Sequence, residues 1–285
     1  MMTLDNSGSM GWQFAPMNTS ANKTKRCYTN FNYNRLYYNP NNTYLPPVKA
    51  DGTRYPDSSF NGAWRDGFTT TAGTRDLRTQ FPAVNNYGDT ALGTASRSAF
   101  YYNYTGTSPA TPVVGTCYAD ASYTLVDMNL ATTAQKTNFA NWFSYYRFRM
   151  NAMKTSAGEA FRVVDDTFRV GLHTINSPGG TGSSGAFLGL DTFTGTQKTN
   201  WYTRFYQQIA SGSTPLRAAQ QRIGEYYRAG TSPAGGSVPD PIQYSCQQNY
   251  HLLTTDGQWN SSGASGTVGS TNYDNTLPAN PDLLT

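Results

Sequence analysis

Charged residues are scarce in this sequence, and long apolar runs are absent. Only 13% of the 285 residues are charged, and the formal net charge is +4. The lysines and arginines are scattered along the chain, so no basic stripe for nucleic acid and no polybasic patch for a membrane surface stands out. No run of about eighteen apolar residues occurs, so we expect no transmembrane segment. Neither nucleic acid nor a membrane is an expected partner.

The sequence also lacks the motifs that mark common enzymes. It contains no G-x-S-x-G elbow, no Walker phosphate loop and no G-x-G-x-x-G fingerprint. Its two histidines, His173 and His251, lie in segments with strand character, where packing is more common than catalysis. A nucleophilic Ser7 or Ser9 needs a positioned base, and neither histidine follows from the sequence as that base. We predict that the chain is not an enzyme, with a hydrolase that uses a cation as Lewis acid as the weakest alternative.

Cysteines are few and carry no metal-binding or redox spacing. Cys27, Cys117 and Cys246 form no C-x-x-C pair, so neither a zinc site nor a thioredoxin-like motif is indicated. The polar, uncharged composition with 21 tyrosines suits an exported protein. In an exported protein we expect one disulfide and one odd thiol, and we favour Cys27 with Cys117 because both lie in one inserted region, described below. Three buried, reduced thiols are the alternative.

Three oxygen-bearing side chains stand at alternate positions near the start of the chain. They are Asp5, Ser7 and Ser9 in the segment D-N-S-G-S-M. Gly8 lets the backbone turn tightly enough for all three oxygens to face one point. Mg²⁺ prefers about six oxygen ligands and often keeps some of its waters, so one carboxylate and two hydroxyls suit half of its shell. The alternative is an ordinary turn in which these side chains bond to the local backbone.

The segment from Thr132 to Ala157 predicts one long helix. Thr132 and Gln135 form a capping-box pair, and apolar side chains then recur at spacings of three and four residues. The stripe consists of Phe139, Trp142, Phe143, Tyr146, Met150, Met153 and Ala157. Such a stripe faces a core, so we assign it no ligand role.

Strands and helices alternate in the second half of the chain. The pattern predicts a buried strand over 168–175, a Gly/Ser-rich connection over 177–185, helices over 200–210 and 215–228, and a strand over 250–254. This alternation predicts an α/β fold with a doubly wound, mostly parallel sheet. Ligands of such sheets bind at the carboxyl ends of the strands.

We divide the chain into three parts. Residues 1–10 and 132–260 form the α/β core, residues 11–131 form an insertion, and residues 261–285 form a flexible tail or the truncated end of the domain. The insertion mixes aromatic residues with Asn, Gly and Pro, which predicts turns, short strands and loops around a small core of its own. Its aromatic residues are equally suited to binding and to packing.

The pattern Asp-x-Ser-x-Ser resembles the metal-ion-dependent adhesion site of von Willebrand factor A domains. The resemblance implies that a threonine from a second loop and an aspartate from a third complete the site, and Thr214 and Asp256 match these positions. The site would hold Mg²⁺, or else Mn²⁺ or Ca²⁺, through Asp5, Ser7, Ser9, Thr214 and Asp256. Thr214 is alternatively the N-cap of the helix that follows, and Asp256 with Gly257 a hairpin turn.

Further stretches resemble the amino-terminal A domain of the PilC/PilY family of type IV pilus tip proteins. They are Tyr38-Asn39-Pro40 with Thr43 to Pro47, Ser144 to Lys154, Ser213 to Arg217, Gly224 to Tyr227, Cys246 to Tyr250 and Thr255 to Asn260. The resemblance implies an exported protein at the pilus tip, outer surface or periplasm of a Gram-negative bacterium. Its partners would be pilus-tip proteins such as minor pilins, or a host or abiotic surface, bound through an acidic side chain at the metal.

A second function fits the same resemblance. The domain would be a structural or mechanosensing component of the pilus tip, and the metal would only hold the three loops together. We also expect a fragment, because residues 1–4 leave little room for the first strand. The end of the domain and the family's carboxyl-terminal propeller are not recognisable after Asn260.

Overall fold

The computed structural model describes residues 1–13, 25–81, 97–176, 187–230, 232–233 and 238–257. Its main sheet has the strand order β7-β6-β1-β8. The strands are β1 (Met2–Leu4), β6 (Arg169–Thr174), β7 (Leu188–Thr192) and β8 (Leu252–Thr254). β1 is central and parallel to both β6 and β8, whereas β7 is antiparallel to β6. The prediction of an α/β fold with a mostly parallel sheet is therefore confirmed.

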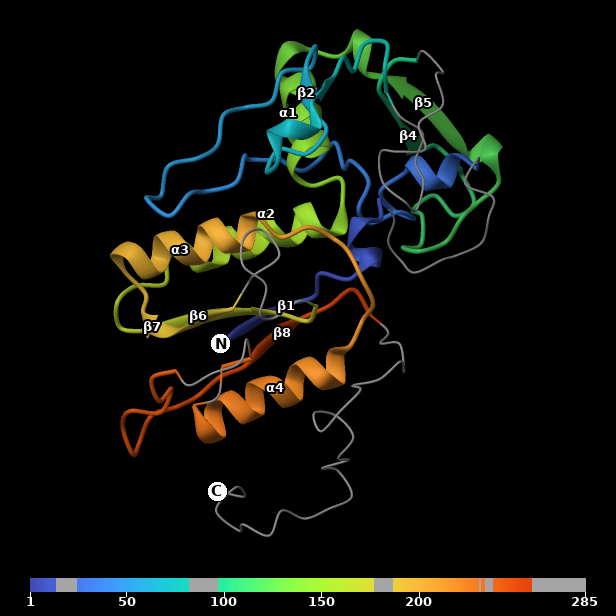
Figure 1. The fold of residues 1–285 in the computed structure, drawn as a ribbon. Helices are drawn as coiled ribbons and strands as arrows, with labels where there is room; N and C mark the ends of the chain where they lie inside the picture. Colours follow the sequence, from blue (N-terminus) through green and yellow to red (C-terminus); the bar gives the residue numbers. More distant parts are fainter. Residues whose placement is uncertain (14–24, 82–96, 177–186, 231, 234–237, 258–285) are drawn as a thin grey trace.

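Helices cover both faces of this sheet (Figure 1). α2 (Arg149–Phe161) and α3 (Gly195–Tyr206) lie on one face, and α4 (Leu216–Ala229) lies on the other. Successive side chains of β1 point to opposite faces of the sheet, so the strand contacts both helical layers. Met2 and Leu4 pack in the cluster that includes Trp201 and Phe205 of α3. The opposite face packs against Ile223 and other apolar residues of α4.

The predicted long helix is two helices with a break at residues 146–148. α1 (Thr133–Tyr145) starts with the predicted capping box of Thr132 and Gln135, so its start is confirmed. The prediction of a single helix is wrong, because tertiary contacts replace helical hydrogen bonds at the break. The backbone N–H of Arg149 donates to the carbonyl of Trp12 at 3.0 Å, and the buried Arg147 guanidinium lies over the ring of Phe143 at 3.8 Å.

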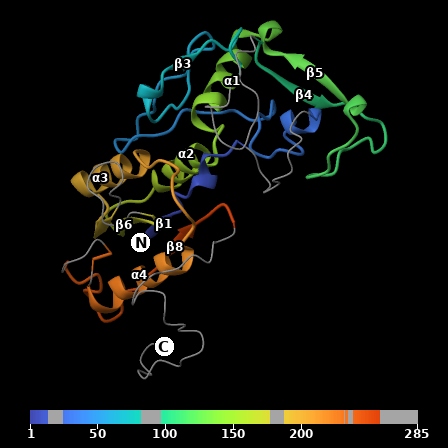
Figure 2. The ribbon, with the colours of Figure 1, turned by 45° about the vertical axis from the view of Figure 1, so that its right-hand side comes forward.

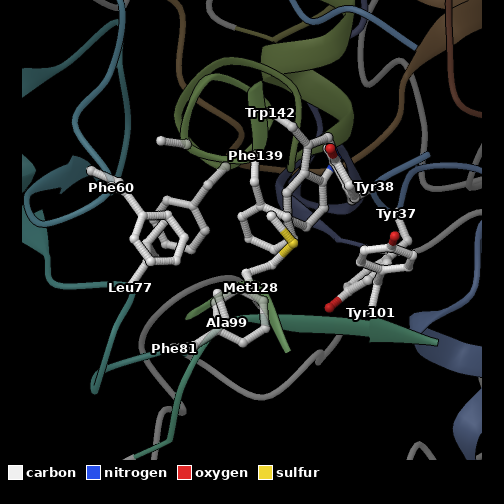
Figure 3. Packing of buried hydrophobic residues seen from close by; sticks show 13 residues of the cluster. Tyr37, Tyr38, Phe60, Leu77, Phe81, Ala99, Tyr101, Met128, Phe139 and Trp142 are labelled. Carbon is white, nitrogen blue, oxygen red and sulfur yellow. The ribbon is translucent and has the colours of Figure 1, made fainter. Parts of the chain in front are cut away.

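α1 packs into an aromatic cluster built mostly by the insertion (Figure 3). The ring of Tyr38, from the insertion, lies 4.7 Å from that of Phe139 and 5.9 Å from that of Trp142, both on α1. The strands of the insertion are short and antiparallel: β2 (Ala63–Trp64) with β3 (Thr74–Arg75), and β4 (Phe100–Tyr104) with β5 (Tyr123–Asp127). Figure 2 shows β3 on one side of α1 and β4 and β5 on the other, all distant from α4.

The remaining predictions from the sequence have mixed outcomes. The disulfide Cys27–Cys117 is present and Cys246 is exposed, so the favoured pairing is confirmed. β6 and α4 occupy the predicted segments, whereas α3 starts five residues before the predicted position. The connection over 177–185 and the tail over 261–285 lie outside the described residues. Among the described helices, none is long and apolar enough to cross a membrane.

Candidate metal site

Asp5 follows β1 directly and lies at the carboxyl end of the central strand. Its side chain is fully buried, with 0% of the residue exposed. One carboxylate oxygen accepts a hydrogen bond from the backbone N–H of Ser7 at 2.8 Å, and the other accepts one from the hydroxyl of Thr255 at 2.8 Å. Within the described part of the chain, no lysine or arginine forms an ion pair with Asp5. A buried carboxylate with only neutral donors favours a cation beside it.

Ser7 and Ser9 bring their hydroxyls together in the loop that follows Asp5. The 3-10 helix η1 (Gly8–Gly11) begins directly after Ser7, and the two Oγ atoms lie 3.1 Å apart. The side chain of Ser7 forms no capping hydrogen bond with η1. The turn alternative holds in part, because the bond from the Ser7 N–H to Asp5 is that of an Asx turn. This turn uses the backbone N–H of Ser7, whereas the hydroxyl of Ser7 bonds to that of Ser9.

The loop that carries Thr214 lies against the loop that follows β1. The N–H of Gly8 donates to the carbonyl of Gly212 at 3.1 Å, and the N–H of Ser211 donates to the carbonyl of Asn6 at 2.8 Å. Gly212 has a φ of +85°, and a Cβ there would lie 3.1 Å from the side chain of Asn176. This glycine therefore permits the left-handed turn of the loop and the close approach of Asn176, which follows β6.

Thr214 is buried, and its loop connects α3 to α4 rather than following a strand. The N-cap position of α4 is occupied by Pro215, so Thr214 lies one residue before the cap that we considered for it. Its loop still reaches the carboxyl edge of the sheet. There Asn176, just after β6, donates to the carbonyl of Ser213 at 2.6 Å.

Asp256 follows β8 and is held by an arginine that the sequence did not identify as part of the site. Arg149 Nη1 donates to Asp256 Oδ2 at 2.6 Å, and the two side chains are only 7% and 8% exposed. The neighbouring residues tie this loop to the first one, since the N–H of Asp5 donates to the carbonyl of Thr254 at 2.9 Å. Arg149 falls within the stretch 144–154 that resembles the PilC/PilY family, but its partner lies 107 residues away.

The donor set consists of two carboxylates and three hydroxyls, which suits a hard divalent cation such as Mg²⁺, Mn²⁺ or Ca²⁺. Over the described ranges, no three residues of the types His, Cys, Asp and Glu gather as a metal-binding group. A cation bound here would therefore depend on the hydroxyls of Ser7, Ser9 and Thr214 as well as on Asp5 and Asp256. The hydrogen bonds between the three loops bring these side chains to one edge of the sheet.

His173 lies in β6, and His251 lies directly before β8. Thr3 Oγ1 lies 3.2 Å from Nδ1 of the buried His173 and 2.8 Å from Nε2 of His251. Burial lowers the pKa of His173 to about 3 and that of His251 to about 4. Both rings are therefore neutral at pH 7 and packed, as predicted.

Comparison with known proteins finds the type IV pilus biogenesis factor PilY1 of Pseudomonas aeruginosa strain PAK, 34% identical over 310 aligned residues. Nearly the whole chain aligns with part of PilY1. The PilY1 proteins of strains PAO1 and UCBPP-PA14 are 32% and 35% identical. Each alignment covers 99% of this chain, but the chain spans only 25%, 25% and 24% of the PilY1 proteins.

These relatives bear out the resemblance to PilY proteins. No family model matches the chain, and no solved structure matches it. A von Willebrand A fold and its metal site therefore stay predictions that depend on the residues and loops described above.

Proposed function

We propose that this chain is a cation-dependent binding domain of a type IV pilus protein, with a fold of the von Willebrand A type. The observation that carries the proposal is the fully buried Asp5 carboxylate at the meeting point of three loops, in the same loop as the paired hydroxyls of Ser7 and Ser9. The similarity to PilY1 over 99% of the chain supports the pilus assignment.

Asp5, Ser7, Ser9, Thr214 and Asp256 would hold one divalent cation, some directly and some through water. When bound, the cation supplies a positive centre that accepts an acidic side chain of a partner. The partner would be a pilus component, such as a minor pilin, or a surface outside the cell. The domain would accordingly act at the pilus tip, the outer surface or the periplasm, as a binding module without catalysis.

Calorimetric titration with Mg²⁺, Mn²⁺ and Ca²⁺ tests this proposal. We expect saturable binding by the wild type and its loss in Asp5→Asn and Thr214→Val, because each variant removes an oxygen ligand without removing a loop. Asp165→Asn is a matched control, since this exposed carboxylate also accepts bonds from a nearby N–H and hydroxyl but lies before β6. A folded wild type that binds no cation would contradict the proposal.

A structural role for the cation is the second candidate. The loops are already joined by backbone hydrogen bonds, such as that from Gly8 to Gly212, and a cation that only strengthens this junction would contribute stability rather than binding. Chelation with EDTA separates the two. If the cation is only structural, its removal should lower the Tm but leave adhesion to purified pili unchanged at a temperature below the Tm. If the cation serves binding, its removal should abolish adhesion.

A further inference from the structure

The Arg149–Asp256 ion pair includes one of the five proposed ligands of the cation, Asp256. Its N–O distance of 2.6 Å and the low exposure of both side chains make it a charge-assisted hydrogen bond away from bulk water. Removal of one partner of such a pair is costly, because the other charge remains buried. Asp256 therefore has a positive partner from within the chain.

Arg149 is fixed by contacts with the first loop as well. Its backbone N–H donates to the carbonyl of Trp12 at 3.0 Å, and its guanidinium lies 5.1 Å from the centre of the Trp12 ring. Trp12 directly follows η1, which contains Ser9. One arginine thus connects the loop of Asp5 and Ser9 with the loop of Asp256. The break between α1 and α2 sets it at this position.

The two carboxylates of the site have different surroundings. The hydrogen bonds to Asp5 come from a backbone N–H and from the Thr255 hydroxyl, which are neutral donors. Asp256 Oδ2 accepts from a guanidinium. A cation that approaches this edge therefore finds Asp5 without a competing positive charge, and Asp256 with one.

We propose that Arg149 competes with the divalent cation for Asp256, an inference that rests on the proposed function. A positive charge beside a ligand weakens cation binding. While Asp256 is held by Arg149, the charge of a bound cation is offset mainly by Asp5. The cation then keeps more positive charge toward an acidic side chain of a partner. Arg149 therefore lowers the affinity for the metal and raises the affinity of the loaded site for an acidic group.

The test is calorimetric titration of the full chain with Mg²⁺ in wild type and Arg149→Gln. The glutamine keeps a donor near Asp256 but removes the charge. We expect it to bind Mg²⁺ about tenfold more tightly, to have a lower Tm in EDTA, and to show a larger rise in Tm when Mg²⁺ is added. Arg149→Lys keeps the charge and should bind Mg²⁺ like the wild type.

Arg147→Gln is the matched control for loss of a buried arginine. The guanidinium of Arg147 lies over Phe143 and donates to the carbonyl of Arg65 at 2.7 Å. We expect this variant to have a lower Tm and an unchanged affinity for Mg²⁺. A tenfold tighter binding in this control as well would overturn a specific role of Arg149.

The outcomes separate this inference from the proposed function. Equal or weaker Mg²⁺ binding by Arg149→Gln, beside a wild type that binds, overturns the inference alone. If neither protein binds, both fail. If only Arg149→Gln binds, the proposed function of the wild type fails, and competition by Arg149 is the reason.

A measurement on the wild type covers the case in which Arg149→Gln does not fold. The guanidinium ¹H–¹⁵N signals of Arg149 are assigned by their loss in Arg149→Lys. Saturation with diamagnetic Mg²⁺ should shift these signals, because the carboxylate that they bond to becomes shared or released. Signals that stay in place at saturation would overturn the inference.

Discussion

The hydroxyl of Thr3 links two histidine rings across three strands of the sheet. Arg222 Nε donates to His173 Nε2 over a long 3.4 Å, which leaves the proton of this ring on Nδ1. Nδ1 then donates to Thr3, and the Thr3 hydroxyl donates to Nε2 of His251. This arrangement gives both nitrogens of His173 and the Thr3 hydroxyl a partner while both rings are neutral.

Acid should destabilise the fold through these rings. Burial lowers the pKa of His173 to about 3 and of His251 to about 4, below the ordinary value of 6.5. Below pH 6.5 these histidines bind protons in the unfolded chain but not in the folded chain. Their contribution to the free energy of unfolding is therefore complete above pH 6.5 and is lost as the pH falls toward 4. We expect a loss of about 2 kcal/mol from His173 at pH 5, and less from the more exposed His251. Urea unfolding at pH 7 and pH 5 measures this loss, and equal free energies of unfolding at the two pH values would contradict the prediction.

At the scale of elements, α2 and α3 approach closely at Gly158. An added Cβ there would lie 2.0 Å from the hydroxyl oxygen of Tyr206, and this hydroxyl donates to the carbonyl of Val48 at 2.7 Å. The hydroxyl of Tyr202 also donates to the carbonyl of Gly158. Glycine is a poor helix former, but at this position its lack of a side chain allows α2 and α3 to pack closely.

Gly158→Ala should destabilise the protein by about 1–3 kcal/mol, since displacement of Tyr206 costs more than the gain in helix propensity. Gly224→Ala is the matched control. It lies in α4 with no atom within 4 Å of an added Cβ, so it should raise stability by up to about 1 kcal/mol. Chemical unfolding measures the stability of both variants. A Gly158→Ala variant more stable than the wild type would contradict the prediction, because it would show that α2 and α3 accommodate the methyl group without loss of stability.

Elements could be predicted from the sequence where their signals are local. The capping box of Thr132 and Gln135 and the apolar pattern of α4 lie within single segments. The break after α1 could not be predicted, because it depends on a hydrogen bond between Arg149 and the distant Trp12. The same holds for the site. The spacing of Asp5, Ser7 and Ser9 is local, whereas the ion pair of Asp256 joins residues 107 positions apart.

For the whole molecule, the disulfide and the candidate metal site stabilise different regions. Cys27–Cys117 closes a sequence separation of 90 residues and packs with Tyr28, Tyr33 and Tyr123 in the insertion. Figure 1 shows this region, near β4 and β5, far from α4. The candidate metal site lies at the carboxyl edge of the sheet. The insertion reaches it through Trp12, near the start of the insertion, and Trp12 contacts Arg149.

Replacement of both bridged cysteines by serine should lower the free energy of unfolding by about 2–5 kcal/mol, because the unfolded chain gains freedom. Under conditions where the variant is folded, its affinity for Mg²⁺ should equal that of the wild type. Thermal unfolding and calorimetry measure the two quantities. Loss of Mg²⁺ binding by a folded variant would show that the insertion and the site are not independent.

The central claim is that residues of three loops hold one divalent cation at the carboxyl edge of the sheet. Anomalous diffraction from crystals grown with Mn²⁺ tests it most directly. We predict one strong peak about 2.2 Å from oxygens of the Asp5, Ser7 and Ser9 loop, with Thr214 and Asp256 in contact directly or through water. A peak elsewhere, or none at saturating Mn²⁺, would contradict it.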